Sequence, residues 1–134
     1  LRLCDLLAPI LPLAHAIGRL GCFFNGCCFG RVTHSWMGLT FPGDEAPRLP
    51  VQLFEAAALF ILSMGLFYFS RKKRPEGELF TLYLIAYSVF RFFIEFLRGD
   101  QKVLFFLTPP QWTSIALFFG AIFLFFIISK KSKA

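Results

Sequence analysis

The stretch PVQLFEAAALFILSMGLFYFSRKKRPEGELFTLYLIAYSVFRFFIEFL, residues 50–97, decides the fold of this 134-residue chain. It holds two long apolar runs, residues 50–69 and 79–97, separated by four consecutive basic residues and a proline. Each run has about the 20 residues that an α-helix needs to cross the hydrocarbon core of a bilayer. Because the runs are continuous rather than alternating, they predict helices and not strands.

Two further apolar runs flank this stretch, at residues 5–24 and 111–128. The chain is 57% hydrophobic and only 16% charged, and 20 of its residues are Phe. A soluble domain of this size has too little interior to bury so much apolar surface. The composition excludes a disordered chain and predicts an all-α membrane protein, with a single membrane domain over residues 1–134 and about four transmembrane helices.

The first apolar run has a second interpretation. Ala14-His15-Ala16 fits the small-residue cleavage site of a secretory signal peptide. However, Asp5 stands where a signal peptide carries basic residues, and the apolar pattern continues to Phe24. We therefore interpret residues 5–24 as a membrane helix.

The basic residues predict how the chain is oriented. The run 71–74 lies between the second and third helices, and Lys130, Lys131 and Lys133 follow the fourth. An up-and-down path places both groups on one side, and the positive-inside rule makes that side cytoplasmic. Residues 25–49 and 98–110 then form outer loops, and the C-terminus is cytoplasmic. We interpret the net charge of +6 as a topology signal, not as a nucleic-acid-binding surface.

Charged residues interrupt the apolar runs: Arg19, Glu55, Arg91 and Glu95. Each costs about 2.5–3.5 kcal/mol at the centre of a bilayer, so such residues usually face a packed interior or a wet cavity. At 1.5 Å per residue, Arg19, Glu55 and Arg91 all fall roughly 8–9 Å below the outer interface. Three separate helices are therefore predicted to bury charge at one depth.

The third helix carries its polar residues on one face. They are spaced by 4, 4 and 3 positions: Tyr87, Arg91, Glu95 and Arg98. One interpretation is structural, in which Arg91 and Glu95 neutralise each other and hold helices together. The other is a binding site, because Arg19 and Arg91 at one level can bind a phosphate bidentately. An anionic lipid headgroup is the phosphate present at that depth, and Asn25 and Gln52 are expected to add neutral donors.

Three segments resemble the signatures of the prolipoprotein diacylglyceryl transferases. Residues 18–31, GRLGCFFNGCCFGR, resemble G-R-x-G-N-F-x-N-x-E-x-x-G. Residues 48–55, RLPVQLFE, resemble R-x-P-x-Q-L-Y-E, and residues 90–98, FRFFIEFLR, resemble F-R-x-x-x-E-F-x-R. Each motif alone is weak, but three in the family's order over nearly the whole chain are specific together.

The resemblance implies a multi-pass enzyme of the bacterial plasma (inner) membrane. Such an enzyme moves a diacylglyceryl group from phosphatidylglycerol to the lipobox cysteine thiol of a prolipoprotein and releases glycerol phosphate. Its partners would be phosphatidylglycerol and the signal peptides of prolipoproteins, with no cofactor and no metal. Family members have seven membrane helices, and this chain resembles the last four, so we expect the C-terminal part of a seven-helix bundle.

The resemblance also implies roles for individual residues. Arg19 and Arg91 would be the catalytic arginines, since charge grows on the phosphate in the transition state. Asn25, Glu95 and Arg98 would belong to the same polar network. Together with the residues indicated by depth and helix face, the expected substrate-binding residues are Arg19, Asn25, Gln52, Glu55, Tyr87, Arg91, Glu95 and Arg98.

The chain departs from the family pattern in three respects. Cys22 stands where the signature has its first Asn, and Cys27 stands where it has Glu. The family's essential His belongs to an H-G-G segment that His15 and His34 do not match. We therefore expect the chain to be inactive by itself.

Three alternatives remain at this stage. The chain could be a non-catalytic relative that holds an anionic lipid or a partner helix, a hypothesis that Cys22 and Cys27 favour. It could act through the vicinal thiols of Cys27 and Cys28. A metal site at these cysteines with His15 or His34 is the third, but C-x4-C-C is not a specific zinc pattern.

Overall fold

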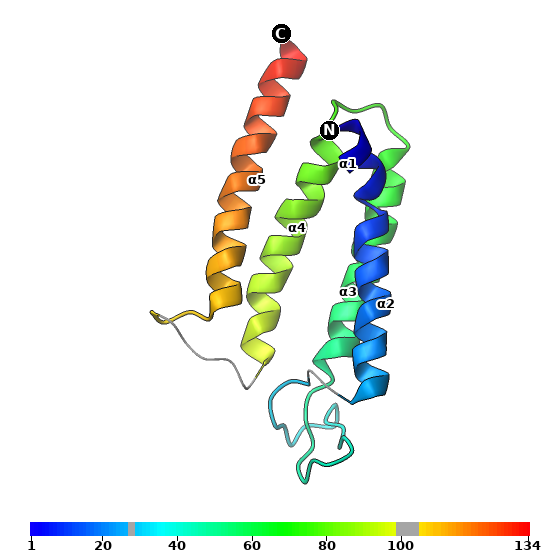
Figure 1. Ribbon diagram of the computed structural model, residues 1–134, viewed down its shortest axis with the longest axis vertical. Coiled ribbons are helices and arrows are strands. Elements are labelled where there is room, and N and C mark those ends of the chain that lie inside the picture. Colours follow the sequence, from blue (N-terminus) through cyan, green and yellow to red (C-terminus); the bar gives the residue numbers. More distant parts are fainter. Residues whose placement is uncertain (27–28, 99–104) are drawn as a thin grey trace.

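The computed structural model describes residues 1–26, 29–98 and 105–134, which are entirely helical apart from loops and two isolated bridges. The helices are α1 (Arg2–Leu7), α2 (Ile10–Asn25), α3 (Val51–Ser70), α4 (Glu78–Ile94), the 3-10 helix η1 (Glu95–Leu97) and α5 (Pro109–Lys133). Helix α2 packs on α3, α4 packs on α5, and the contact between α3 and α4 joins the two pairs (Figure 1). Both chain ends lie at one end of the molecule, and the loop 29–50 lies at the other. The expected all-α class is confirmed.

Three of the described helical segments are long and apolar enough to cross a membrane: Val51–Ser70, Glu78–Leu97 and Pro109–Lys133. The chain is thus a multi-pass membrane protein. The first helix expected in the chain, over residues 5–24, is instead divided into α1 and α2, and α2 has only 16 residues. By length and composition, three of the helical segments that the structure describes, rather than four, meet the requirement for a membrane span.

Prolines explain this break. Pro9 lacks an N–H and its ring collides with the carbonyl one turn earlier, so α1 ends before it. Pro12 is accepted because it falls in the first turn of α2, where N–H groups have no partner within the helix. Ser63 of α3 donates a buried hydrogen bond of 2.6 Å to the Pro9 carbonyl. The break is therefore held against the neighbouring helix.

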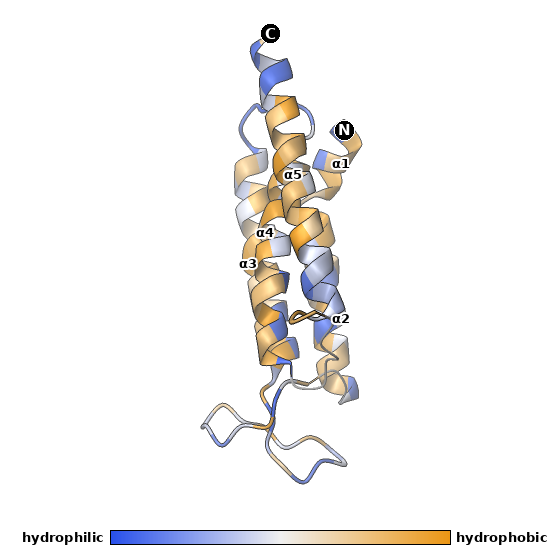
Figure 2. Ribbon diagram, turned by 90° about the vertical axis from the view of Figure 1, so that its left-hand side faces the viewer, coloured by the Kyte–Doolittle hydropathy of each residue, from blue (hydrophilic) through white to orange (hydrophobic). Residues whose placement is uncertain are grey.

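The side chains are distributed in the opposite way to those of a soluble protein. Large apolar side chains such as Ile61, Phe119 and Phe123 are about two-thirds exposed, whereas the polar Gln52 and Thr81 are fully buried. Figure 2 shows hydrophobic residues along most of the helices and hydrophilic residues at the C-terminal end and in the loops. A lipid environment accounts for this pattern, because polar side chains within a bilayer face the interior of the bundle.

Helix α4 begins with a cap supplied by another helix. Its N-cap residue, Gly77, has a positive φ of 91° and no side chain that could cap the helix. The carboxylate of Asp5 in α1 accepts hydrogen bonds from the N–H groups of Gly77, at 2.5 Å, and Phe80, at 2.9 Å. An anion at this position also interacts favourably with the helix dipole. Asp5 therefore fastens α1 to the start of α4.

The substitution Asp5→Ala is expected to lower the free energy of unfolding by about 1–2 kcal/mol, because two N–H groups lose their acceptor. Loss of helical circular dichroism during denaturant titration in detergent micelles measures the change. Leu3→Ala, at an exposed position of the same helix, is the control and should have little effect. Equal stability of the Asp5→Ala variant and the unmodified protein would contradict the capping role.

The start of the loop 29–50 is bonded to the end of the same loop, just before α3, and to η1. The Gly30 N–H donates to the Leu49 carbonyl and the Arg31 N–H donates to the Leu97 carbonyl, each at 2.9 Å. A Cβ atom on Gly30 would overlap the Val51 side chain and lie 2.7 Å from the Leu97 oxygen. Only glycine allows the loop to approach both helices this closely.

Gly30→Ala is expected to destabilise the protein by about 1–3 kcal/mol, the usual cost of forcing extra volume into a packed site. Trypsin cleavage of the loop, monitored in parallel with unfolding, should accelerate. Gly21→Ala is the matched control, since Gly21 lies in α2 with open space around its Cβ position. A Gly30→Ala variant as resistant to trypsin as the control would show that the close approach is dispensable.

Candidate functional site

Arginines from three parts of the chain meet at a single carboxylate. Arg19 of α2 forms an ion pair with Glu55 of α3. Arg91 of α4 donates to Oε1 of Glu55 at 3.1 Å, and Nη2 of Arg98, which follows η1, lies 3.7 Å from the same oxygen. The Glu55 side chain is only 3% exposed. We call Arg19, Glu55, Arg91, Glu95 and Arg98 the arginine cluster.

Small residues between α2 and α3 allow this convergence. Ala16 and Ala56 are buried together with Leu59, so the two helices approach closely just beside the cluster. Arg19 lies one turn after Ala16, and Glu55 directly precedes Ala56. The packing of the two alanines therefore brings the ionic groups of both helices to one level. This agrees with the equal depth that the sequence predicts for Arg19 and Glu55.

Glu95 contributes a second buried carboxylate. It lies one turn after Arg91, and its Oε2 is 3.6 Å from Nη2 of Arg91. Neither carboxylate oxygen accepts a hydrogen bond from any described residue. Arg91 thus makes its shorter contact across to Glu55, not along its own helix to Glu95. Arg91 pairs with both carboxylates, so a pair of Arg91 and Glu95 alone describes only part of the geometry.

The arginine cluster carries an excess of positive charge. Three guanidinium groups face two carboxylates, which leaves one net positive charge. The arginine side chains are 14–17% exposed, whereas both carboxylates are almost completely buried. The arginines are thus the accessible groups of the cluster, and the two carboxylates lie buried beneath them. This arrangement is suited to an additional anion such as a phosphate.

Two rings lie one helical turn from the cluster. His15 of α2 and Tyr87 of α4 pack with ring centroids 5.8 Å apart. Between α4 and α5 lies a cavity of about 320 Å³. Its lining residues are Tyr87, Arg91, Pro109, Pro110, Thr113, Ser114 and Leu117. This cavity reaches the arginine cluster at Arg91.

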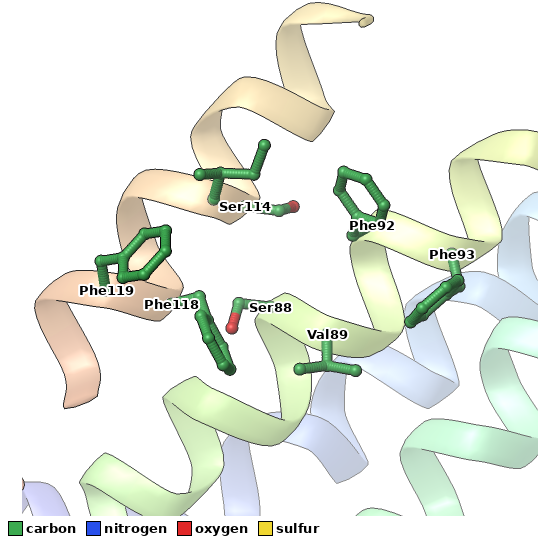
Figure 3. A pocket seen from close by; sticks show the side chains of 8 residues that line it. Ser88, Val89, Phe92, Phe93, Ser114, Phe118 and Phe119 are labelled. Carbon is green, nitrogen blue, oxygen red and sulfur yellow. The ribbon is translucent and has the colours of Figure 1, made fainter.

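A second, apolar pocket of about 200 Å³ lies on the same seam between α4 and α5 (Figure 3). Phe92, Phe93, Phe118 and Phe119 supply most of its aromatic lining, and Ser114 belongs to both pockets. The hydroxyl of Ser114 donates to the Pro110 carbonyl of its own helix at 2.8 Å. With its hydroxyl satisfied in this way, the serine leaves the pocket apolar enough for hydrocarbon.

The other predicted site residues lie outside the arginine cluster. Gln52 is completely buried in the first turn of α3, one turn before Glu55. Asn25 is the last residue of α2, where Gly26 ends the helix with a φ of 73°. Cys22 is half-buried in α2. The predictions for Cys27 and Cys28, and those for 99–104 in the second outer loop, lie outside the described residues.

Sequence reasoning did not identify the central position of Glu55. Its depth matched that of Arg19 and Arg91, but Glu95 was the more obvious partner because it lies one turn from Arg91 on the same helix. The equal predicted depth of Arg19, Glu55 and Arg91 was the sequence feature that pointed to this contact.

Within the described parts of the chain, no group of three or more His, Cys, Asp and Glu side chains is placed to hold a metal ion.

Glu55→Gln is expected to lower the free energy of unfolding by about 3–5 kcal/mol, because three arginines lose the carboxylate they share. Unfolding in detergent micelles measures this loss. Asp44→Asn is the control, because Asp44 pairs with Arg48 in the loop at a partly exposed position. A loss no larger than that of the control would show that Glu55 does not hold the helices together.

Comparison with known proteins agrees with the resemblance seen in the motifs. The sequence model of the family "Prolipoprotein diacylglyceryl transferase" matches residues 1–127. The phosphatidylglycerol–prolipoprotein diacylglyceryl transferase 2 of Clostridium perfringens is 37% identical over 99% of this chain and 54% of its own length. The corresponding transferase of Bordetella avium is 36% identical over 96% of this chain and 51% of its own length.

A third relative, the transferase of Pseudoalteromonas atlantica, is 42% identical over 77% of this chain and 38% of its own length. The chain thus spans about half the length of the curated relatives it matches. The family match covers all of the helices except the last residues of α5, and it includes every member of the arginine cluster. The chain belongs to the prolipoprotein diacylglyceryl transferase family.

Proposed function

We propose that the intact protein carrying this chain transfers a diacylglyceryl group from phosphatidylglycerol to the cysteine thiol of a prolipoprotein. The observation that carries this proposal is the convergence of Arg19, Arg91 and Arg98 on Glu55, with one positive charge in excess. The names of the relatives in Clostridium perfringens and Bordetella avium supply the reaction and its two substrates.

The geometry suits the chemistry of this transfer. A bond between the glyceryl carbon and a phosphate oxygen breaks, a carbon–sulfur bond forms, the thiol loses its proton and glycerol phosphate leaves. Negative charge grows on the phosphate as the bond breaks. Arginines fixed by the buried Glu55 would stabilise that charge more strongly in the transition state than in the ground state. We propose Arg19 and Arg91 as the groups that bind the phosphate.

The surroundings of the cluster fit a lipid substrate. The cavity at Arg91 and the apolar pocket both lie between α4 and α5, and Ser114 lines both of them. A headgroup at Arg91 would therefore have space for hydrocarbon beside it. We assign Asn25, Gln52, Glu55, Tyr87, Glu95 and Arg98 to the same substrate site.

We further propose that the protein lies in the bacterial inner membrane with its C-terminus in the cytoplasm. The basic residues 71–74 lie at the same end of the molecule as the C-terminus, which supports this orientation through the positive-inside rule. The arginine cluster lies toward the opposite end, beside the loop 29–50. Signal peptides that emerge at the outer surface would then reach the cluster.

Arg19→Gln and Arg91→Gln are each expected to lower the transfer rate at least 100-fold, the loss typical when a group that stabilises transition-state charge is removed. The assay uses the intact protein in phosphatidylglycerol vesicles and follows the thioether product on a lipobox peptide. Lys130→Gln, which removes the same charge at the other end, is the control and should retain activity. Normal rates for both arginine variants, with unchanged helical circular dichroism, would refute the proposal.

A non-catalytic role is the second candidate, and Cys22 favours it because a thiol replaces the amide of the family signature in α2. In that case the cluster would hold an anionic lipid without reacting with it. The same assay separates the two functions. Saturable binding of phosphatidylglycerol, lost in Arg91→Gln, together with no thioether product in the unmodified protein would establish binding alone.

A further inference from the structure

We propose that an anionic phospholipid binds at the opposite end of the molecule from the arginine cluster, in a pocket between α1 and the turn after α3. The pocket has a volume of about 180 Å³. Arg2, Lys72 and Arg74 supply cationic groups to it, and Leu6 and Leu79 supply apolar surface. This lipid would be a bound structural ligand, independent of any transfer reaction.

The charges around this pocket are unequally balanced. The Asp5 carboxylate also lines it but is engaged by the N–H groups of Gly77 and Phe80. Arg74 is paired with Glu78 at 2.8 Å. By contrast, Arg2 and Lys72 form no ion pair within the described parts of the chain. Three cations, Arg2, Lys72 and Arg74, then face two carboxylates, Asp5 and Glu78, which leaves one net positive charge and two cations without an ion pair for an anionic headgroup.

Arg74 is held in place for such a contact. Its Nε donates to the Phe69 carbonyl at 3.3 Å, and its guanidinium lies 5.1 Å from the centroid of the Phe69 ring. Together with the ion pair to Glu78, these contacts fix the guanidinium at the rim of the pocket. The pocket thus has one ordered cation and two unpaired ones, rather than three mobile side chains.

The surface beside the pocket favours a lipid over a free phosphate. Leu3, Leu6 and Leu7 of α1 are 40–68% exposed, so this helix presents apolar side chains where acyl chains would lie. Basic pockets between helices at the membrane surface are recurrent sites for anionic headgroups. A phospholipid would place its phosphate between Arg2 and Lys72 and its chains along α1, and would thereby join α1 to the turn.

The test measures binding of phosphatidic acid, which is anionic but is not the proposed donor of the transfer reaction. Native mass spectrometry of the intact protein from micelles counts the lipid retained, in an Arg91→Gln background that weakens the other phosphate site. The double variant Arg2→Gln/Lys72→Gln is expected to retain phosphatidic acid with at least about tenfold lower affinity. The matched control Lys130→Gln/Lys131→Gln removes the same charge at the same end and should bind as before.

A second variant tests whether lost binding results from misfolding rather than from lost charge. Arg2→Lys/Lys72→Arg keeps both charges and is expected to retain the lipid. Equal losses in the glutamine double variant and the control would show diffuse attraction and overturn the pocket, as would unchanged binding in both. Equally tight binding of glycerol 3-phosphate without acyl chains would overturn the assignment to a lipid.

Discussion

The arrangement of the helices depends on one buried carboxylate. Glu55 lies between the guanidinium groups of Arg19, Arg91 and Arg98, which come from α2, α4 and the residue after η1. A buried charge without partners is very costly, so the position of Glu55 is tolerable only while the other elements remain packed around it. The same contact leaves the arginines preorganised and, together with Glu95, in excess by one charge. Glu55 therefore both joins the helices and fixes the arginine side chains.

Polar contacts between helices recur throughout this protein. Ser63 donates to the Pro9 carbonyl, Asp5 caps α4, and Gln111 of α5 donates to the Phe92 carbonyl of α4 at 3.4 Å. In a bilayer the exposed apolar side chains gain little from packing against one another, because lipid is equally apolar. Close packing and satisfied polar groups must then specify which helices are neighbours. The small residues Ala16 and Ala56 at the seam of α2 and α3 follow the same principle.

The two ends of the molecule have different chemistry. At one end, three arginines surround two buried carboxylates beside an apolar seam between α4 and α5. At the other, basic side chains surround a capping carboxylate near the short, leucine-rich α1. The first arrangement keeps its charges largely buried, and the second keeps them near the surface.

The sequence by itself determined the helical membrane class, the family motifs and the equal depth of Arg19, Glu55 and Arg91. These features follow from local hydropathy and from a constant rise per residue, which need no knowledge of neighbours. Only the tertiary structure decided that Arg91 contacts Glu55 more closely than Glu95, and that Asp5 caps a helix 72 positions away. Such choices depend on how each helix rotates and packs against segments distant in the chain, and periodicity within one segment does not encode that rotation.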